Sequence, residues 1–540
     1  MVRRADQATT GGVATNPSEG LSRPMVRAPD HGANERGIIG SWSIAGCPLV
    51  RTMDQDGRAP RYARAVTSSI ESRGPDLLVL GATVVTATGS RRADVAVRGG
   101  SIEAVEPDLS GLVAGAGEVL DASGLLLLPG CVDVHTHTRV ASDGEPDRFF
   151  QDSLGAAFGG TTTFLAFNNP GTGSSAAAHR SILTGIEEFR RVTASDSAVD
   201  FALSPAILGG MDDPLAELPA MVDEGIPTAK AFMVFDFRLA DRAIYDAMAI
   251  LGARGGMLEV HCEDPVLIDA AVASALQHGD TSPRHHAATR TTDAEAVATH
   301  RAMAFARATG APVHVVHLSC AAALRFVAEA RADGVRATAE TCPHYLALTD
   351  ARYDEPDPLE CAKSVISPPL RPAADLDALW TGLSTGDLSL VATDHVPDRI
   401  AVEKGEAARG VSFDRISNGA PGIETLLSVV YSEGVARGRI TLERMVDLLA
   451  ATPAARFGLA RTGAIEVGRD ADLVVFDPLA HRTIRAAELH HTSDFTPYEG
   501  LAVSGAVRTV LVRGRAVIRD GRAVGDRGFG QFVERGAAGG

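Results

Sequence analysis

The sequence predicts an α/β fold, a (β/α)8 TIM-like barrel with a small β-sandwich domain. Eight short apolar runs alternate with helical stretches through the middle of the chain, which is the rhythm of a parallel barrel. Runs of β-forming residues lie on both sides of this region. The first residues show neither pattern and are rich in Gly, Ser, Pro, Arg and Asp, a composition typical of disorder. We expect a disordered extension (1–75), the first half of the β-sandwich (76–128), the barrel (129–462), the second half of the β-sandwich (463–515) and a C-terminal arm (516–540).

The predicted β-sandwich is split between the two sides of the barrel. On the amino-terminal side, Leu77–Val85 and Ala93–Arg98 are short runs of β-forming residues separated by a glycine-containing turn. Similar runs return near the other end of the chain, at Asp472–Pro478 and Thr509–Ile518. We interpret the four runs as two halves of one small β domain, with the barrel inserted between them.

The barrel prediction depends on eight candidate strands. Helical stretches between them, such as Ala294–Thr309 and Ala321–Asp333, support a strand-then-helix order. A barrel of this kind carries its active site at the carboxyl ends of its strands. The candidate strands are Val132–His137, Thr161–Asn169, Val199–Ile207, Thr228–Phe235, Met257–Glu263, Pro312–Ser319, Arg336–Pro343 and Leu388–His395.

The composition of the chain restricts the class of molecule that the protein can bind. Hydrophobic residues make up 45% and charged residues 22% of the 540 residues, as in a globular protein with a large core. The formal net charge of -17 argues against nucleic acid and anionic membranes, because both attract basic surfaces. No apolar run approaches the roughly 18 residues of a membrane span. We therefore expect a small-molecule enzyme.

The amino terminus and the cysteines indicate the cellular compartment of the protein. The first residues lack the charged, apolar and small-residue regions of a secretory signal. The six cysteines show no paired short spacing, so reduced thiols are a better interpretation than a disulfide framework. Together these features predict a cytoplasmic protein.

Polar residues gather at the carboxyl ends of the candidate strands. The apolar run Leu125–Pro129 leads into His135 and His137, so we expect one apolar strand that ends in two histidines. Residues i and i+2 of a strand share a face, so these two imidazoles would project together. Each polar residue taken singly could be a hydrogen-bonded core residue, but six at equivalent strand ends indicate a common site. The six are His135, His137, Lys230, His261, His317 and Asp394.

Lys230 calls for a chemical reason. The chain has only three lysines among its 51 basic residues, and this one lies inside the apolar run Ile226–Phe235. A charged lysine is costly to bury unless something neutralises or pairs it. A lysine that has reacted with CO₂ is a carbamate, an anion whose two oxygens could bridge two metal ions.

The six residues suit a metal centre. Neutral histidine nitrogens with an aspartate oxygen favour Zn²⁺ and are compatible with Mn²⁺ or Co²⁺. A catalytic zinc usually keeps three protein ligands and an open position, so five or six ligands are too many for one ion. The sequence therefore predicts two divalent metal ions.

An ordered set of motifs resembles the cyclic amidohydrolases, and within them the dihydropyrimidinase and D-hydantoinase family. The resemblance runs from about Asp76 to the end of the chain and leaves only the first 75 or so residues outside. The motifs are Asp133–His137, Lys230–Met233, Glu259–Asp264, Val315–Ser319, Ser367–Arg371, Thr393–Pro397, Asn418–Glu424, Gly463–Asp472, Pro497–Gly500 and Gly528–Phe532.

The resemblance implies a barrel with a β-sandwich, two metals bridged by carboxylated Lys230, and a homotetramer. Asp394 would take a proton from the attacking hydroxide and pass it to the leaving ring nitrogen. Ser367 and Asn418 match positions that contact the cyclic amide, although a turn residue and a loop cap remain alternatives. One metal would be held by His135, His137, Lys230 and Asp394, and the other by Lys230, His261 and His317.

Several residues depart from the hydantoinase pattern. Arg139 creates a His-x-His-x-Arg motif, as in dihydroorotases, where the arginine binds a substrate carboxylate; a surface salt bridge is the equal alternative. Asn168-Asn-Pro170 also resembles dihydroorotases and allantoinases. Asp398, however, stands where dihydroorotases would carry a second histidine after the Asp-His-x-Pro motif. Phe235 replaces the tyrosine that donates to the substrate oxyanion in hydantoinases, so Tyr345 or Arg139 would have to supply the donor, or the metals would hold the charge.

These features predict metal-dependent hydrolysis of a hydantoin or dihydropyrimidine-type ring to an N-carbamoyl amino acid. An allantoinase or another cyclic ureide or imide hydrolase is the alternative. A dihydroorotase or a non-catalytic homologue fits less well, because Asp398 disagrees with the first and the complete ligand set disagrees with the second.

Overall fold

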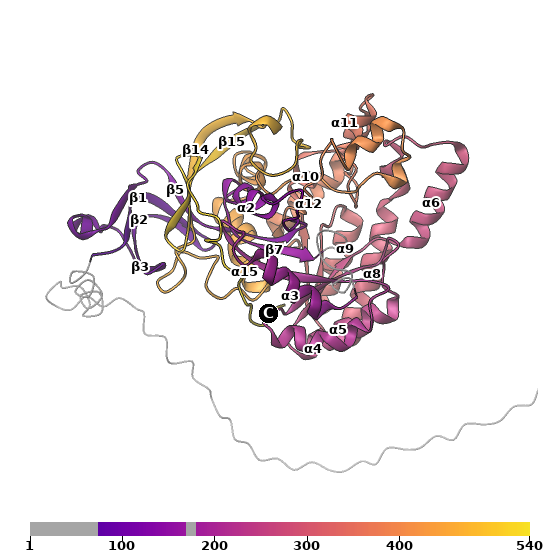
Figure 1. Ribbon diagram of the computed structural model, residues 1–540, viewed down its shortest axis with the longest axis horizontal. Coiled ribbons are helices and arrows are strands. Elements are labelled where there is room, and N and C mark those ends of the chain that lie inside the picture. Colours follow the sequence, from indigo (N-terminus) through magenta and orange to yellow (C-terminus); the bar gives the residue numbers. More distant parts are fainter. Residues whose placement is uncertain (1–73, 169–179, 540) are drawn as a thin grey trace, which may run out of the picture. The chain divides into compact units, whose positions relative to one another are not determined.

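The computed structural model describes residues 74–168 and 180–539, all within one compact unit, Arg61–Gly540 (Figure 1). The predicted disordered extension (1–75) lies outside the described residues except for its last two, and so do Asn169 and Pro170. Across the described part of the chain, no helix combines the length and apolar character needed to cross a membrane.

The eight predicted barrel strands form one parallel sheet in chain order, which confirms the predicted fold class. A bridge between Thr136 and His395 brings the first strand next to the segment that follows the last. The strands are β6 (Cys131–Thr136), β7 (Thr161–Asn168), β8 (Asp200–Ile207), β9 (Thr228–Phe232), β10 (Met257–His261), β11 (Val313–Val315), β12 (Ala337–Thr341) and β13 (Leu390–Val391).

Most of these strands end earlier than the sequence pattern predicts, and the residues beyond them turn over the barrel mouth. Phe235, His317 and Asp394 all have positive φ, at 75°, 37° and 49°. Residues other than glycine rarely adopt this left-handed conformation, and where they do they often belong to functional sites. The directions of these three side chains therefore cannot be inferred from the alternation of side chains along a strand.

The apolar run Leu125–Pro129 does not continue into the strand that carries His135. The run forms β5 (Leu126–Pro129), which pairs with strands of the other sheet, whereas β6 begins the barrel. Gly130 separates the two strands, and a Cβ atom at this position would lie 2.0 Å from the Thr162 side chain. The chain can pass from one sheet to the other here because glycine has no side chain.

Helices cover the outside of the barrel, with α3, α4, α5, α8 and α9 drawn around its lower right side in Figure 1. The two helices that the sequence located are confirmed as α8 and α9, and Thr291 caps α8 by accepting from Ala294 N. The α-helices are α2 (Arg148–Phe158), α3 (Ile182–Thr193), α4 (Pro214–Asp223), α5 (Asp241–Ala253), α6 (Pro265–His278), α7 (His285–Thr289), α8 (Thr292–Thr309), α9 (Ala321–Ala332), α10 (Pro343–Ala347), α11 (Pro358–Ala362), α12 (Ala373–Thr385), α13 (Leu426–Val430), α14 (Leu442–Val446) and α15 (Thr452–Arg456).

Shorter helical turns connect these elements. Two of them, η5 and η6, are π-helical segments that continue α13 and α14. The segments are η1 (Ser110–Gly115), η2 (Asp350–Asp354), η3 (Lys404–Arg409), η4 (Phe413–Arg415), η5 (Tyr431–Val435), η6 (Asp447–Ala451) and η7 (Ala486–Glu488).

The second sheet combines strands from both flanks of the barrel, as predicted. Among the described residues it has nine strands, and β5 pairs antiparallel with β14 to join the two halves. The run predicted at Thr509–Ile518 is a hairpin of two strands, so the expected boundary at residue 515 falls inside it. The strands are β1 (Leu77–Thr86), β2 (Gly89–Arg98), β3 (Ser101–Glu106), β4 (Glu118–Asp121), β5 (Leu126–Pro129), β14 (Leu473–Thr483), β15 (Ala502–Val512), β16 (Arg515–Arg519) and β17 (Arg522–Ala523).

The C-terminal arm returns to the barrel. Val533 N donates to Phe201 O and Arg535 N to Gly225 O, each at 2.8 Å. The Arg535 side chain is 5% exposed, and its guanidinium donates to Leu203 O at 2.7 Å. These contacts involve the amino-terminal portion of the barrel sheet, so the arm stabilises the end away from the predicted site.

Candidate metal and substrate site

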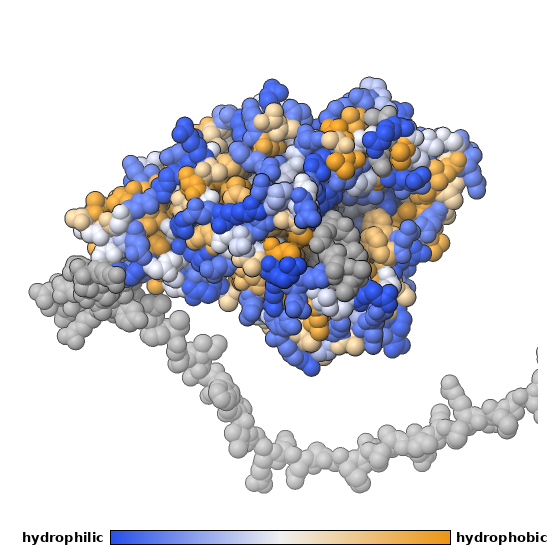
Figure 2. Space-filling view, in the orientation of Figure 1, coloured by the Kyte–Doolittle hydropathy of each residue, from blue (hydrophilic) through white to orange (hydrophobic). Residues whose placement is uncertain are grey.

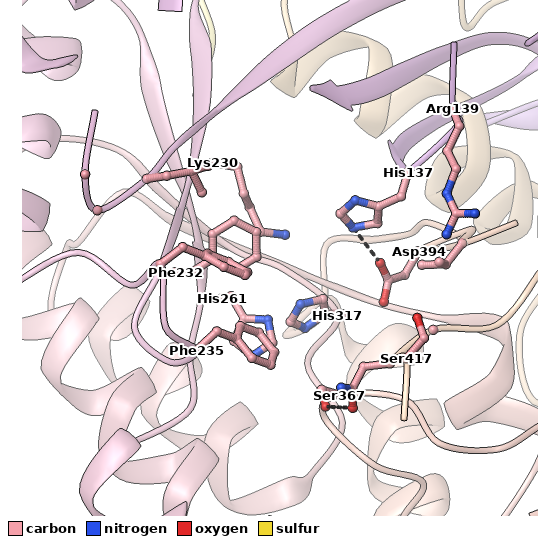
Figure 3. Close-up of a pocket in the computed structure, with 17 residues that line it drawn as sticks. His137, Arg139, Lys230, Phe232, Phe235, His261, His317, Ser367, Asp394 and Ser417 are labelled. Atoms are coloured by element: carbon pink, nitrogen blue, oxygen red, sulfur yellow. Dashed lines mark hydrogen bonds and ion pairs between the residues drawn. The ribbon is translucent and has the colours of Figure 1, made fainter. Parts of the chain in front are cut away.

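One cavity is lined by all the residues that the sequence predicts for the site except His135, which is fully buried (Figure 3). It measures about 510 Å³ and lies at the carboxyl ends of the barrel strands. Ligand atoms of His135, His317 and Asp394 all lie within 4.8 Å of one another, a spacing that one metal ion could span. The predicted residues that line the cavity are His137, Arg139, Lys230, His261, His317, Ser367, Asp394 and Asn418.

Asp394 is the centre of one group of side chains. Its Oδ1 atom lies 3.0 Å from His135 Nε2 and 3.2 Å from His137 Nε2. Lys230 Nζ lies 3.2 Å from the same His135 nitrogen. His261 and His317 form a neighbouring group, with ring centroids 4.5 Å apart. Ligand atoms of His317 also lie within 4.8 Å of those of His135 and Asp394, so the two groups adjoin each other.

Burial controls the charge of these groups. It lowers the pKa of His137, His261 and His317 and so favours neutral imidazoles, the form that binds metals. Burial also lowers the pKa of Lys230, although Asp394 and Glu340 oppose it. Burial and Lys230 act in the same direction on His135, but nearby carboxylates outweigh them and raise its pKa to about 9.

The donor set fits a metal centre. The Nδ1 atoms of His137 and His317 are buried and have no hydrogen-bond partner among residues 74–168 and 180–539. Such orphaned nitrogens are uncommon unless a water molecule or an ion satisfies them. Burial would raise the pKa of Asp394, but His135 and His137 hold it well below its ordinary range, so it offers an anionic oxygen.

Glu340 is a functional residue that the sequence reasoning missed. It is fully buried in β12, and its Oε1 atom contacts His135 Nδ1 and accepts from His317 N at 3.1 Å. Its other oxygen lies 3.0 Å from His314 Nε2. Burial would raise the pKa of Glu340, but the two histidines hold it well below its usual range. The sequence did point to Glu340, because a charged acid inside a predicted core strand is as costly to bury without a partner as Lys230 is.

Glu263 plays the same role for the other group. Its Oε2 atom lies 2.7 Å from His261 Nε2 and accepts from Arg290 Nη1 at 2.5 Å. Arg290 and His261 outweigh burial and lower the pKa of Glu263 to about 2. This carboxylate fixes the orientation of the His261 ring, as acids behind metal-binding histidines commonly do.

The side of the cavity opposite these metal-binding groups is a wall that carries Ser367 and Asn418. Ser367 Oγ donates to Asn418 Oδ1 at 2.8 Å, so the two residues predicted to contact the cyclic amide lie together. Phe235 also lines the cavity, with its ring centroid 5.2 Å from that of His261. Tyr345 is not among the described residues that line the cavity, and its hydroxyl donates to Pro368 O at 2.6 Å. It is therefore not the replacement donor that the sequence suggested.

Comparison with known proteins identifies the family. The model of the Amidohydrolase family matches residues 126–517. The chain belongs to the amidohydrolase family. This amidohydrolase is 38% identical to the D-hydantoinase of Geobacillus stearothermophilus over 464 residues, which are 85% of this chain and 96% of that protein. It is 37% identical to the D-hydantoinase of Streptomyces coelicolor over 467 residues, which are 85% and 97% of the two chains.

Solved structures show the same likeness. The amidohydrolase superposes on the dihydropyrimidinase from Brevibacillus agri NCHU1002 with a TM-score of 0.80 and 37% identity, covering 85% of this chain and 99% of that one. The L-hydantoinase (dihydropyrimidinase) from Arthrobacter aurescens gives 0.77 with 28% identity, covering 85% and 100%. The resemblance inferred from motifs is therefore confirmed.

Arg139 is held by acids in this amidohydrolase. Its Nη2 atom donates to Asp398 Oδ1 at 2.7 Å, and its Nη1 atom donates to Glu403 Oε1 at 2.5 Å. Asp398 is fully buried, and the Arg139 side chain is 14% exposed. Both terminal nitrogens are engaged by carboxylates, so this geometry favours a salt bridge over direct binding of a substrate carboxylate. The salt bridge is largely buried and does not lie on the surface as expected.

Proposed function

We propose that this amidohydrolase opens a hydantoin or dihydropyrimidine-type ring by hydrolysing its cyclic amide bond, which yields an N-carbamoyl amino acid. The observation that carries the proposal is the cluster of His135, His317 and Asp394 beside the buried amine of Lys230, at the mouth of a barrel. The likeness to D-hydantoinases over 85% of the chain supports the choice of reaction.

The residues fit two divalent metal ions, Zn²⁺ above all, with Mn²⁺ or Co²⁺ as alternatives. Lys230 would carry a carbamate, because the lowered pKa favours the neutral amine that adds to CO₂ with loss of a proton. When bound, the metals supply a Lewis acid for the ring carbonyl and lower the pKa of a water molecule. One ion would be held by His135, His137, Lys230 and Asp394, and the other by Lys230, His261 and His317.

Asp394 is the proposed proton carrier. It is ionised at neutral pH because His135 and His137 hold its pKa low, so it can accept a proton from the attacking water. It would then deliver that proton to the ring nitrogen as the amide bond breaks. Ser367 and Asn418, on the facing wall, would hold the ring amide so that its carbonyl points at the metal side.

An allantoinase, or another hydrolase of cyclic ureides or imides, is the second candidate. Phe235 weakens the match to hydantoinases, because phenylalanine lacks the hydroxyl donor that they use at this position, and so leaves room for this candidate. A dihydroorotase is disfavoured, since the two terminal nitrogens of Arg139 are engaged by Asp398 and Glu403. The complete set of metal-binding side chains disfavours a non-catalytic role.

A substrate panel tests the proposal. Purified enzyme loaded with Zn²⁺ is offered hydantoin, dihydrouracil, allantoin and dihydroorotate, and ring opening is measured by loss of ring absorbance and by product mass. We expect turnover of a hydantoin or dihydropyrimidine ring, abolished in Asp394→Asn. Turnover of allantoin alone would establish the second candidate instead, and equal turnover in Asp394→Asn would exclude the role given to this aspartate.

We also propose that the enzyme is a homotetramer in the cytoplasm. Helix α6 supports a contact between copies, because Val266 is 73% and Leu267 42% exposed on it. Hydrophobic patches lie at the right edge of the face in Figure 2, where Figure 1 places α6. Light scattering during size-exclusion chromatography should give the mass of four chains, and the mass of one chain would contradict this.

A further inference from the structure

Lys404 is a buried cation away from the metal-binding groups. It is one of the three lysines of the chain and is fully buried at the start of η3. Its Nζ atom donates to Ser417 O at 2.6 Å and to Val365 O at 2.8 Å. A buried ammonium is costly unless its donors are satisfied, so these contacts need to compensate its desolvation. Burial nevertheless lowers the pKa of Lys404 to about 8, against the opposing effect of Asp398.

The two carbonyl groups belong to the segments that form the substrate wall. Ser417 directly precedes Asn418, and Val365 lies two residues before Ser367. Gly419 N also donates to Val365 O at 3.0 Å, so the two segments are joined behind the cavity. Ser417, Asn418 and Ser367 line the cavity, whereas Lys404 is not among the described residues that do. Lys404 therefore acts on the wall from behind and touches no substrate.

A chain of charges connects this lysine to the metal side. Asp398 Oδ2 lies 3.8 Å from Lys404 Nζ, and its Oδ1 accepts from Arg139 at 2.7 Å. Arg139 follows His137 by two residues and lines the same cavity as Asp394 (Figure 3). The series Arg139, Asp398, Lys404 thus runs from the end of β6 to the backbone of the wall.

We propose that Lys404 is a positioning residue that fixes the wall carrying Ser367 and Asn418 at its distance from the metal-binding side chains. The effect of Lys404 on substrate binding rests on the proposed function, in which a ring amide lies between the wall and the metal-binding side chains. The ammonium does this by joining two carbonyls of the wall, and Asp398 with Arg139 anchors it to β6. A loosened wall would have to become ordered when the ring binds, and that ordering weakens substrate binding.

Lys404→Met and Lys363→Met form a matched pair for the test. Methionine keeps the length of lysine and removes the donors and the charge. Lys363 is the one other lysine outside the metal site, and its Nζ pairs with Glu360 of α11, whose side chain is 48% exposed. In Lys404→Met we expect the KM of the ring substrate to rise by about tenfold or more, with kcat changed less. Metal content should stay as in the wild type, Lys404→Arg should recover some of the loss, and Lys363→Met should behave as the wild type.

Hydrogen exchange gives a readout that does not depend on turnover. Peptides that contain Gly419 should exchange faster in Lys404→Met than in Lys363→Met, while peptides from β6 and β10 stay protected. If the wild type opens no ring of the panel, the proposed function fails, but exchange still decides the role of Lys404. Unchanged exchange at residues 417–419 overturns the positioning role, and so does an unchanged KM.

A general loss of stability is the remaining alternative. Should Lys404→Met be too unstable to purify, Asp398→Asn keeps the shape of the carboxylate and removes its charge. The positioning role requires faster exchange at residues 417–419 with normal metal content in that variant. Faster exchange spread over the whole barrel, or loss of metal in step with activity, would overturn it.

Discussion

The metal-binding half of the cavity is built on barrel strands and on the residues that directly follow them, whereas the wall that faces it is built on longer loops. Each group of metal-binding side chains has a buried carboxylate behind it, Glu340 for His135 and Glu263 for His261. The wall carries Ser367 and Asn418 on irregular segments whose backbone is joined through Lys404. Strands therefore fix His135, Lys230 and His261 on the metal side, while the wall depends on a few side chains that can differ without unfolding the barrel.

This contrast indicates that one half of the cavity determines the reaction and the other half determines the substrate specificity. Barrels keep their chemistry at the strand ends and change substrates through the loops that follow the strands. The departures from the hydantoinase pattern agree with this division, since Arg139, Phe235 and Asp398 all lie beyond strand ends. We expect substitutions on the metal side to abolish activity and substitutions on the wall to change which ring is preferred.

Lys230→Ala should have the largest effect. It removes the amine that would carry the bridging carbamate, so most of the bound metal and nearly all ring-opening activity should disappear. Elemental analysis of the purified variant measures the metal, and Lys363→Ala is the control for loss of a lysine. A Lys230→Ala enzyme with wild-type metal content and turnover would rule out the bridging carbamate.

Glu340→Gln should have the next largest effect. The amide keeps the size of the side chain but is a weaker partner for His135 and His314. Loss of such an acid behind a metal-binding histidine typically costs about 10- to 100-fold in metal affinity. Competition with a chelator measures the affinity, and Glu360→Gln, at the exposed pair with Lys363, is the matched control. Equal affinities in the two variants would show that Glu340 has a structural role alone.

Phe235→Tyr tests the wall directly and should increase activity. Removal of one oxyanion donor costs about 10²- to 10³-fold in turnover where it has been measured, so restoring a hydroxyl should raise kcat severalfold on hydantoin and dihydrouracil. Phe237→Tyr adds a hydroxyl to another aromatic residue of the cavity and should not raise it. Rapid turnover of both rings by the wild type, with no gain in Phe235→Tyr, would mean that another group supplies the donor.

The sequence predicts the metal side well because its information is local. The eight strands and their polar ends can be recognised from apolar runs and from six unusual side chains. The partner of Glu340 could not be predicted, because His135 lies 205 positions away and composition does not show which buried groups meet.

The wall is less predictable, because it is defined by contacts between loops. The sequence pointed to Ser367 and Asn418 through family resemblance, but nothing in it showed that Lys404 joins their segments. Tyr345 was suggested as a donor from its place in the sequence, yet its hydroxyl donates to Pro368 O. The backbone turns with positive φ at Phe235 and Asp394 were also invisible, because both residues continue apolar runs that resemble strands.

Arg139→Met should have the smallest effect on substrate preference. If Arg139 bound a substrate carboxylate, its loss would penalise dihydroorotate far more than dihydrouracil, since the two rings differ by that carboxylate. In the structure Asp398 and Glu403 already neutralise the guanidinium, so the variant should lose similar, modest activity on both rings. The measurement is the ratio of kcat/KM for dihydroorotate to kcat/KM for dihydrouracil, which we expect to stay within about threefold of the wild-type ratio, below the tenfold that 1.4 kcal/mol of selective binding would give. A fall of tenfold or more in this ratio would show that Arg139 leaves its acidic partners to bind substrate, and the wall would then recognise charge as well as the ring amide.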